Sequence, residues 1–380
     1  MYNNLNQHLL LFADCIISEG YLNNIIFDLT REQNSSFIPA SYVNFINKCK
    51  DYTLNEIFSF HENESNILDE YVKFTLDNEY GFLCDRILVN SFPPISENLN
   101  SPEYIDNCIL ELSNFEVVYL KKINFIFDQL IVNSVEIRIK LIEYSELIIL
   151  LESFNSSSVE SISLYVNEFK GEVILNKLNE LLKKHFRIKK VIICNSFENQ
   201  LNTDSIIKFS KDSLSILVNK AFSPSNIINI SYFIESQKVN PYYYKKMIID
   251  YEGNIKNLDK CFGRVDEIKS KNDILNIVQS LSFQSLWRVS KNNIQVCLDC
   301  EYKSVCFDTR KPYKENNSNK YYFKEECIYN PYIGKTKGEE GYLTLEESGV
   351  ISNENGYSIN HEKIAKINAF LWIEEEIKTE

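Results

Sequence analysis

The sequence of 380 residues predicts an α/β protein with a smaller domain on each side of its central sheet. Residues 103–235 alternate between short apolar runs and amphipathic helical patterns, which is typical of a parallel sheet. The residues before them combine strand and helix patterns, and four cysteines gather in the residues after them. At about 150 residues per domain, we expect three domains, at 1–95, 96–240 and 241–380.

The first 95 residues are expected to form a small α+β domain. Their apolar patterns predict a strand, three helices and a second strand, at 25–29, 39–46, from 53, 66–76 and 82–84. Glu56 follows Thr53 by three residues, which is typical of a capping box at the start of a helix. This order of elements is winged-helix-like. Few Arg or Lys residues stand where such a domain would read DNA, so the pattern favours packing over DNA binding.

The middle of the chain repeats a strand followed by a helix. The apolar runs predict strands at Cys108–Leu112, Val135–Ile139, Ile162–Val166, Val191–Cys194 and Ile216–Val218. The helical patterns between them lie at Phe115–Leu130, Tyr144–Leu151 and Val173–Leu182. Consecutive β-α units imply a parallel sheet, either as a partial barrel or as an open sheet.

From residue 241 the pattern changes. Glu252-Gly253-Asn254 separates two apolar runs, 247–251 and 255–258, and predicts a hairpin. Further helices are expected at about 273–283 and 361–376. The last of these would place four apolar residues on one face, namely Ile364, Ile367, Phe370 and Leu371.

Composition limits the kinds of partner. The net charge of −13 argues against nucleic acid, because phosphate binding needs a basic surface. No apolar stretch approaches the roughly 20 residues of a transmembrane helix, and the N-terminus lacks the basic region of a signal peptide. We therefore expect a cytoplasmic protein without membrane partners, in which thiols stay reduced.

Four cysteines near the C-terminus are the clearest sign of chemistry. Cys297, Cys300 and Cys306 have C-x2-C-x5-C spacing, and Cys327 follows after a polar loop. Four thiolates suit a zinc ion, which usually uses paired C-x2-C units, or an iron–sulfur cluster. The spacing, with only one C-x2-C pair, favours the iron–sulfur cluster but leaves zinc open.

The other cysteines have a different setting. Five of them stand singly in apolar patterns and are expected to be buried free thiols: Cys15, Cys49, Cys84, Cys108 and Cys194. Cys261 follows the predicted hairpin, and its role is open.

The segment from Cys297 to Arg310, together with Cys327 and the Tyr-Asn-Pro-Tyr that follows, resembles a SPASM domain. More narrowly, it resembles the SPASM-domain peptide maturases of grasp-with-spasm systems. The resemblance extends upstream through Phe283–Lys291, and to short motifs at 27–29 and 37–39. It implies that Cys297, Cys300, Cys306 and Cys327 hold one auxiliary-type [4Fe–4S] cluster.

Two departures from the radical SAM pattern matter. Arg310 stands where a further cysteine is expected, and upstream only Cys261 is a candidate ligand, so a second auxiliary cluster is not expected. The chain has no C-x3-C-x2-C triplet for the cluster that cleaves S-adenosylmethionine (SAM). The resemblance therefore implies a degenerate radical SAM-like partial barrel at 96–240, without bound SAM, followed by a SPASM domain at 241–380.

The resemblance also implies a function. We expect a maturation factor for a ribosomally synthesised and post-translationally modified peptide, which acts beside an ATP-grasp ligase. The N-terminal domain would recognise the leader of the precursor peptide as an added strand. Two alternatives stay open: a redox enzyme that modifies the precursor through its cluster, and a zinc-stabilised scaffold for protein interactions.

Overall fold

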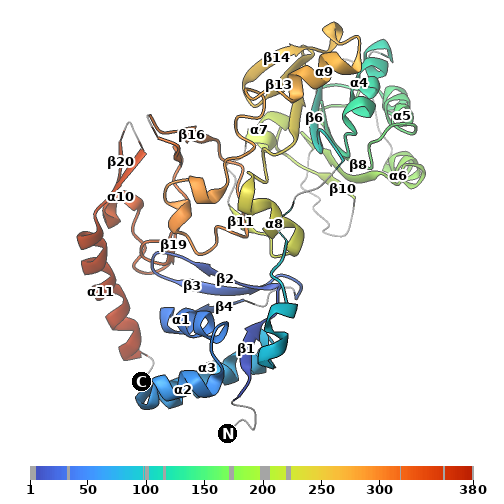
Figure 1. The fold of residues 1–380 in the computed structure, drawn as a ribbon. Helices are drawn as coiled ribbons and strands as arrows, with labels where there is room; N and C mark the ends of the chain where they lie inside the picture. The colour runs from blue at the N-terminus through green and yellow to red at the C-terminus, as the bar shows by residue number, and fades with distance from the viewer. Residues whose placement is uncertain are drawn as a thin grey trace. The chain divides into compact units, whose positions relative to one another are not determined.

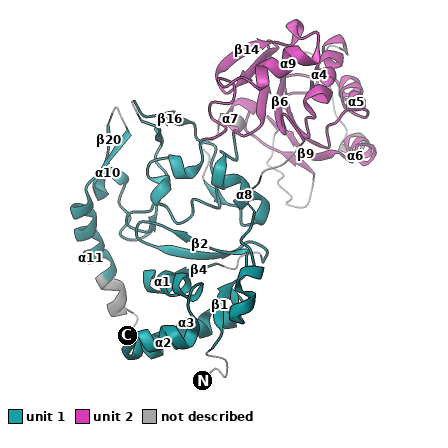
Figure 2. Cartoon of the chain, viewed as in Figure 1, with its two compact units in different colours: residues 1–99, 222–242, 289–380 teal, residues 100–221, 243–288 magenta. Residues whose placement is uncertain are grey.

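A computed structural model describes residues 6–31, 35–96, 98, 102–113, 117–170, 175–196, 206–219, 224–316, 318–353 and 356–378 (Figure 1). The chain forms two compact units, shown in Figure 2. The cysteine unit comprises residues 1–99, 222–242 and 289–380. The sheet unit comprises residues 100–221 and 243–288.

The sheet unit is built on an eight-stranded sheet in the order β10-β9-β8-β7-β6-β12-β13-β14. The first six strands in this order are parallel, and β13 and β14 are antiparallel to their neighbours. The strands are β6 Asn107–Leu112, β7 Ser134–Ile139, β8 Ser161–Val166, β9 Ile188–Ile193, β10 Ile207–Phe209, β12 Lys246–Ile249, β13 Asn254–Asn257 and β14 Lys260–Arg264. The α/β class and the large parallel sheet predicted from sequence are confirmed.

Helices cover one face of this sheet. They are α4 Val117–Leu130, α5 Tyr144–Ser153, α6 Leu175–Lys184 and α9 Lys271–Val278, and a further helix, α7 Leu214–Asn219, follows β10. Val135, Ile137 and Ile139 alternate along β7 and are buried in the main hydrophobic core with residues of α4, α5, α6 and α9. The residues between them, Glu136 and Arg138, point to the opposite face because successive side chains of a strand alternate.

The helices and strands of the sheet unit follow the predictions with one exception. Ile216–Val218, predicted as a strand, lies in helix α7. A three-residue apolar run does not distinguish a strand from one turn of a helix, and here Leu214 is the buried residue while Ile216 is exposed. The predicted helix starts at Phe115 and Val173 lie outside the described residues.

The predicted hairpin is confirmed between β12 and β13, and Gly253 in its turn has a φ of 78°. Asp250 organises the turn: its carboxylate accepts hydrogen bonds from the backbone N–H groups of Glu252 and Asn254, at 3.0 and 2.9 Å. It also pairs with Lys256. Because these strands extend the parallel sheet, residues 243–288 belong to the sheet unit, which differs from the division expected at 241.

The cysteine unit begins with two small sheets and three helices. A three-stranded antiparallel sheet has the order β2-β3-β4, and β1 pairs with β5. The elements are β1 His8–Leu11, β2 Cys15–Glu19, β3 Asn24–Asp28, β4 Ser35–Ile38, α1 Ala40–Cys49, α2 Leu54–Phe60, α3 Ser65–Asp77 and β5 Gly81–Cys84. The capping box of Thr53 and Glu56 at the start of α2 is confirmed. The sequence missed β1, β2 and β4, and the winged-helix interpretation stays a prediction.

The rest of the cysteine unit consists of short strands and turns. Its strand pairs are β11 Ser225–Asn226 with β15 Cys306–Phe307, β16 Pro312–Lys314 with β17 Tyr321–Phe323, β18 Tyr329–Asn330 with β19 Lys335–Thr336, and β20 Val350–Asn353 with β21 Gly356–Ile359. Its helices are α8 Ile230–Lys238, α10 Leu345–Ser348 and α11 His361–Lys378, with 3-10 turns at Lys291–Asn293 and Cys297–Asp299.

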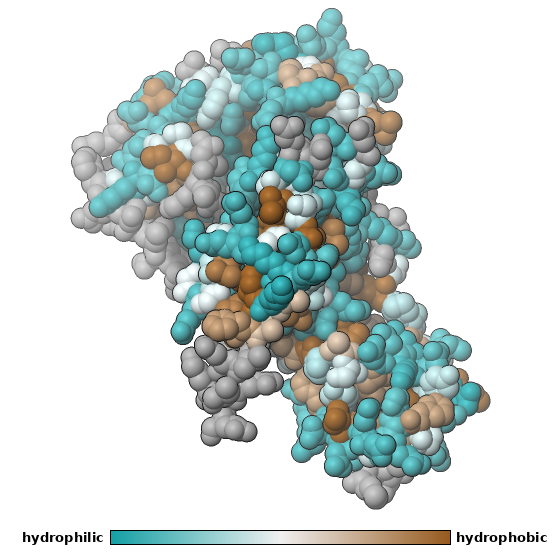
Figure 3. Space-filling model, turned by 90° about the vertical axis from the view of Figure 1, so that its left-hand side faces the viewer, coloured by the Kyte–Doolittle hydropathy of each residue, from teal (hydrophilic) through white to brown (hydrophobic). Residues whose placement is uncertain are grey.

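Two helix predictions need correction. The helix expected at 273–283 is α9, which ends at Val278. The single apolar face expected for the last helix is wrong: Ile364 is buried, but Phe370 is 69% exposed. Among the described residues, no helix is long and apolar enough to cross a membrane. Figure 3 shows a mostly hydrophilic face with scattered hydrophobic residues, as is usual for protein surfaces.

Replacing Asp250 with Asn tests the β12–β13 turn. Burial alone would raise the pKa of Asp250, but hydrogen bonds from Lys256 and Asn254 lower it to about 2 from a usual value of 3.8. A lowered pKa stabilises the fold above the unfolded-state value and is lost as the pH falls through the folded-state value. We expect Asp250→Asn to lower the free energy of unfolding by about 2 kcal/mol at pH 7, measured by urea denaturation.

The difference between the two proteins should shrink as the pH falls from about 4 to about 2. Glu160→Gln is the matched control, because Glu160 is an exposed carboxylate of the same unit. A difference that stays constant over this pH range would contradict the prediction.

Candidate metal-binding site

The four clustered cysteines lie in the loops of the cysteine unit. Cys297 begins a 3-10 turn, Cys300 ends it, Cys306 begins β15, and Cys327 lies two residues before β18. All four side chains are half-buried. Val296, just before Cys297, has a φ of 69°, which is rare and unfavourable for a β-branched residue. Strained backbone of this kind concentrates at functional sites.

The four thiols influence one another electrostatically. Burial raises the pKa of Cys306 to about 12 and raises that of Cys300 well above its usual value. Cys327 contributes to the shifts at Cys297 and Cys306, and both of these contribute to the shift at Cys300. Among the residues that the structure describes, no three His, Cys, Asp or Glu side chains are arranged around a point that could hold a single metal ion.

Two of the sulfur atoms accept backbone hydrogen bonds in the same local pattern. The N–H of Tyr329 lies 3.5 Å from Sγ of Cys327, and the N–H of Tyr302 donates to Cys300. In both cases the donor is two residues after the cysteine. At Cys300 this bond lowers the pKa and so opposes part of the rise that burial causes.

A buried group of charges adjoins the cysteines. Nζ of Lys291 lies 2.6 Å from Oδ2 of Asp308, and Nη2 of Arg310 lies 2.7 Å from the same oxygen. The three side chains are 6%, 0% and 12% exposed, respectively. The ring of Phe323 packs against both cations, with its centroid 4.8 Å from Nζ of Lys291 and 4.2 Å from Cζ of Arg310. We call Lys291, Asp308 and Arg310 the charged triad.

The triad and the thiols act on one another. Burial would raise the pKa of Asp308, but Lys291 and Arg310 lower it to about 2. Burial raises the pKa of the Cys297 thiol, whereas the positive charges of Lys291 and Arg310 oppose that rise. The positive charge of Lys291 likewise opposes the rise in the pKa of Cys306. The cations of the triad thus lower the pKa of Cys297 and Cys306 relative to the effect of burial alone.

A buried carboxyl group, that of Glu301, directly follows Cys300 in the chain. Glu301 is fully buried, and burial raises the pKa of its side chain. Oε1 accepts hydrogen bonds from Tyr329 and, at 3.3 Å, from Nδ2 of Asn23. Oε2 has no hydrogen-bond partner among the residues that the structure describes.

The turn between β2 and β3 packs directly on the cysteine loop. The N–H of Tyr21 donates to the carbonyl of Asp299 at 2.7 Å, and Nζ of Lys303 donates to the carbonyl of Glu19 at 2.7 Å. A Cβ atom on Gly20 would lie 2.8 Å from the backbone nitrogen of Glu301. This close approach explains why glycine occupies the position.

The remaining cysteines are placed as expected. Cys15, Cys49, Cys84, Cys108 and Cys194 are buried free thiols. Cys261, whose role the sequence left open, is exposed on β14 of the sheet unit.

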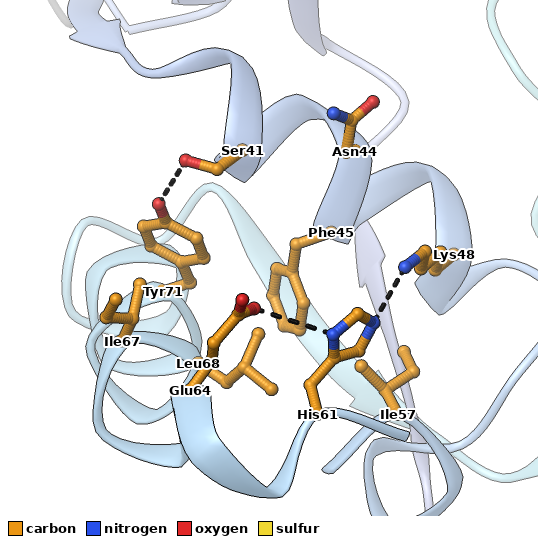
Figure 4. A pocket seen from close by; sticks show the side chains of 10 residues that line it. All are labelled: Ser41, Asn44, Phe45, Lys48, Ile57, His61, Glu64, Ile67, Leu68 and Tyr71. Carbon is orange, nitrogen blue, oxygen red and sulfur yellow. Dashed lines mark hydrogen bonds and ion pairs between the residues drawn. The ribbon is translucent and has the colours of Figure 1, made fainter.

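A separate pocket of about 310 Å³ opens between α1, α2 and α3 (Figure 4). Apolar side chains form part of its wall, among them Phe45, Ile57 and Leu68. On its rim, Nζ of Lys48 lies 2.8 Å from Nε2 of His61. The sequence analysis did not find this pocket, because its residues come from three helices and carry no motif.

The charged triad and Glu301 were not predicted from the sequence as parts of the site. A signal was present for three of these residues, since Asp308 and Arg310 follow Cys306 closely and Glu301 follows Cys300. Lys291 lies six residues before Cys297, and only the fold shows that its ammonium group reaches Asp308.

The structure is similar to two crystal structures of SuiB from Streptococcus suis, one of them bound to S-adenosylmethionine. The sequence identities are 12% and 11%, and the TM-scores are 0.29 and 0.26. Each likeness covers 78% of this chain and 94% of SuiB. No protein-family model and no curated protein sequence matches the chain. At TM-scores this low, the likeness establishes neither a shared fold nor a shared activity.

Replacing Gly20 with Ala tests the contact between the β2–β3 turn and the cysteine loop. The new methyl group would meet backbone atoms of Asn23 and Glu301 within 2.8 Å, and backbone cannot move aside as a side chain can. We expect a loss of about 1–3 kcal/mol in the free energy of unfolding, measured by urea denaturation. Gly263→Ala is the control, because its Cβ would meet the flexible end of Ile277. Equal effects of the two substitutions would refute the prediction.

Proposed function

We propose that this protein is a maturation factor that binds a ribosomally made precursor peptide and presents it to an ATP-grasp ligase. One observation carries the proposal: the four-cysteine site is packed against the turn of the small sheet, whose other edge strand, β4, pairs only with β3 among the described residues. Tyr21 and Glu19 on that turn are hydrogen-bonded to the cysteine loop. A metal site that orders this loop would therefore also order the peptide-binding sheet.

Four free thiols in one loop region are the kind of donor set that an iron–sulfur cluster uses. Backbone N–H groups donate to Cys300 and Cys327, and the positive charges of Lys291 and Arg310 oppose the rise that burial causes in the pKa of Cys297. Both features stabilise negative charge on sulfur. When bound, a [4Fe–4S] cluster would supply either a rigid crosslink between the loops or one-electron transfer. Cys297, Cys300, Cys306 and Cys327 would be its ligands.

Strand β4 is the proposed docking edge for the peptide. Among the described residues it pairs only with β3, and Phe37 on it is 62% exposed. The opposite edge strand, β2, ends at Glu19, which contacts Lys303 of the cysteine loop. A peptide added as a strand beside β4 would gain backbone hydrogen bonds, and Phe37 would supply an apolar contact. The net charge of −13 favours a peptide that carries Lys or Arg.

Metal analysis tests the proposed cluster. Protein purified without oxygen should be brown, absorb near ~400 nm and contain iron and acid-labile sulfide. Cys300→Ser should lose most of the iron, because one of four ligands is removed. Cys261→Ser should keep it, since Cys261 is not one of the four proposed ligands. A colourless protein with stoichiometric zinc would contradict the cluster and favour the zinc-stabilised scaffold.

Peptide titration tests the proposed docking edge. The probe is a set of short synthetic peptides rich in Lys and Arg, and binding is followed by calorimetry. Phe37→Ser should weaken binding about tenfold, because an exposed apolar contact is lost without disturbing the core. Phe60→Ser is the control: Phe60 is 60% exposed but lies on α2. If both variants bind like the unmodified protein, β4 is not the docking edge.

A further inference from the structure

We propose that the pocket between α1, α2 and α3 binds the side chain of a tyrosine residue carried by a peptide partner, with Ser41 and Tyr71 holding the phenol hydroxyl. The inference does not rest on the proposed function, because the described residues that line the pocket include no cysteine and no residue of β4. The volume of about 310 Å³ is near the lower end of the ~300–1,000 Å³ usual for ligand sites, so the pocket suits one large side chain.

The pocket is a groove between two helix faces of the same spacing. On the side of α1, the lining residues recur three and four positions apart: Ser41, Asn44, Phe45 and Lys48. On the side of α3 and the residue before it, the same spacing gives Glu64, Ile67, Leu68 and Tyr71. Ile57 of α2 completes the lining.

The interior of the groove is apolar and partly aromatic. Phe45, Ile57 and Leu68 are 3%, 0% and 6% exposed and belong to a hydrophobic core. The ring centroids of Phe45 and Tyr71 lie 5.7 Å apart, and the ring planes are tilted by 46°. A third ring can pack against this pair, because aromatic rings attract one another in tilted and edge-on arrangements at about 4.5–7 Å.

Two hydrogen-bonded bridges cross the groove, one at each end (Figure 4). At one end, Oγ of Ser41 lies 2.6 Å from the hydroxyl oxygen of Tyr71. At the other end, Nζ of Lys48 donates to Nε2 of His61 at 2.8 Å, and Nδ1 of His61 lies 3.5 Å from Oε2 of Glu64. Ser41 and Lys48 are about 10 Å apart along α1, so the pocket is a short slot with a polar group at each end.

The charged bridge has no need of a ligand. An ammonium group only donates, so Nε2 of His61 is the acceptor from Lys48, and the ring proton lies on Nδ1, toward Glu64. Both ring nitrogens of His61 are therefore used. Lys48 and Glu64 are exposed, so water can satisfy the rest of their hydrogen-bonding capacity.

The hydroxyl bridge has capacity to spare. Two hydroxyl groups carry two hydrogens, and the bond between Ser41 and Tyr71 uses one, so one hydrogen and several lone pairs have no partner among the described residues. A ligand that displaces water from this end has to replace both kinds of bond. A phenol hydroxyl donates and accepts, whereas an indole N–H only donates and a phenyl ring does neither. The bridge therefore favours tyrosine over tryptophan and phenylalanine.

A free amino acid is the competing occupant. Free tyrosine would bring an ammonium and a carboxylate group close to Lys48 and Glu64, which His61 already links. A tyrosine residue within a peptide brings neither charge. The rim of the pocket can also contact the residues beside it in the peptide, since Ile67 is 48% exposed.

The test measures the binding of three probes to the full-length protein by ligand-detected NMR titration. N-acetyl-tyrosinamide represents a tyrosine residue within a peptide, N-acetyl-phenylalaninamide lacks the hydroxyl, and free tyrosine represents the competing occupant. We expect the tyrosine amide to bind up to about tenfold more tightly than the phenylalanine amide, which is the ratio that one neutral hydrogen bond supplies. Free tyrosine should bind more weakly than its amide.

Two variants locate the ring and its hydroxyl. The double variant Ser41→Ala, Tyr71→Phe removes both hydroxyls of the bridge, so the two amides should bind alike, with the affinity of the phenylalanine amide unchanged. Ile67→Ser removes an apolar group from the rim and should weaken both amides about threefold while their ratio is kept. Tyr52→Phe is the control, because Tyr52 is 43% exposed and does not line the pocket.

Several results would overturn the proposal. Equal binding of the two amides to the unmodified protein would remove the role of the hydroxyl bridge, and equal weakening of both in the double variant would make the bridge a structural element only. Unchanged binding to Ile67→Ser would place the ring elsewhere, and binding of free tyrosine but not of its amide would make the pocket a small-molecule site. Circular dichroism shows whether each variant is folded. If the double variant is not, the amide ratio of the unmodified protein and the effect of Ile67→Ser still decide.

Discussion

The contact between the β2–β3 turn and the cysteine loop is the constraint on which the cysteine unit depends. It joins residues that are almost three hundred positions apart in the chain, as in the bond between Asn23 and Glu301. The approach is so close that only glycine fits at position 20. Because the loop is mostly turns and two- or three-residue strand pairs, it has little regular structure of its own to hold it. The packed turn and the buried charged triad each restrain it.

Electrostatics at this site are a balance of two opposing effects. Burial disfavours the thiolate form, as the raised pKa values of Cys300 and Cys306 show. Backbone N–H groups and the cations of the triad work in the other direction. At Cys297, Cys300 and Cys306 burial is the largest of these effects, so the pKa of each of these thiols is raised.

The sheet unit shows how an α/β pattern can end without closing. The chain moves from β6 outward to β10 and then returns to the other side of β6 with β12, after which the hairpin strands β13 and β14 extend that edge. Asp250 stabilises the turn of this hairpin. Its carboxylate accepts hydrogen bonds from the N–H groups of Glu252 and Asn254, so these donors of the turn have a partner. Antiparallel strands can be added by a short turn, whereas a further parallel strand would need another crossover helix.

Local patterns in the sequence determined most of the elements. The alternation of Val135, Ile137 and Ile139 specified β7, the capping box of Thr53 and Glu56 specified α2, and Gly253 specified the hairpin turn, because each of these signals depends on residues close together in the chain. The cysteine spacing likewise singled out four candidate ligands. Only the tertiary structure decided that the hairpin joins the parallel sheet, that Ile216 lies in a helix, and that Lys291 and Arg310 share one buried carboxylate. These features arise from packing and charge pairing between segments distant in sequence, and no local pattern encodes which distant partner a residue will meet.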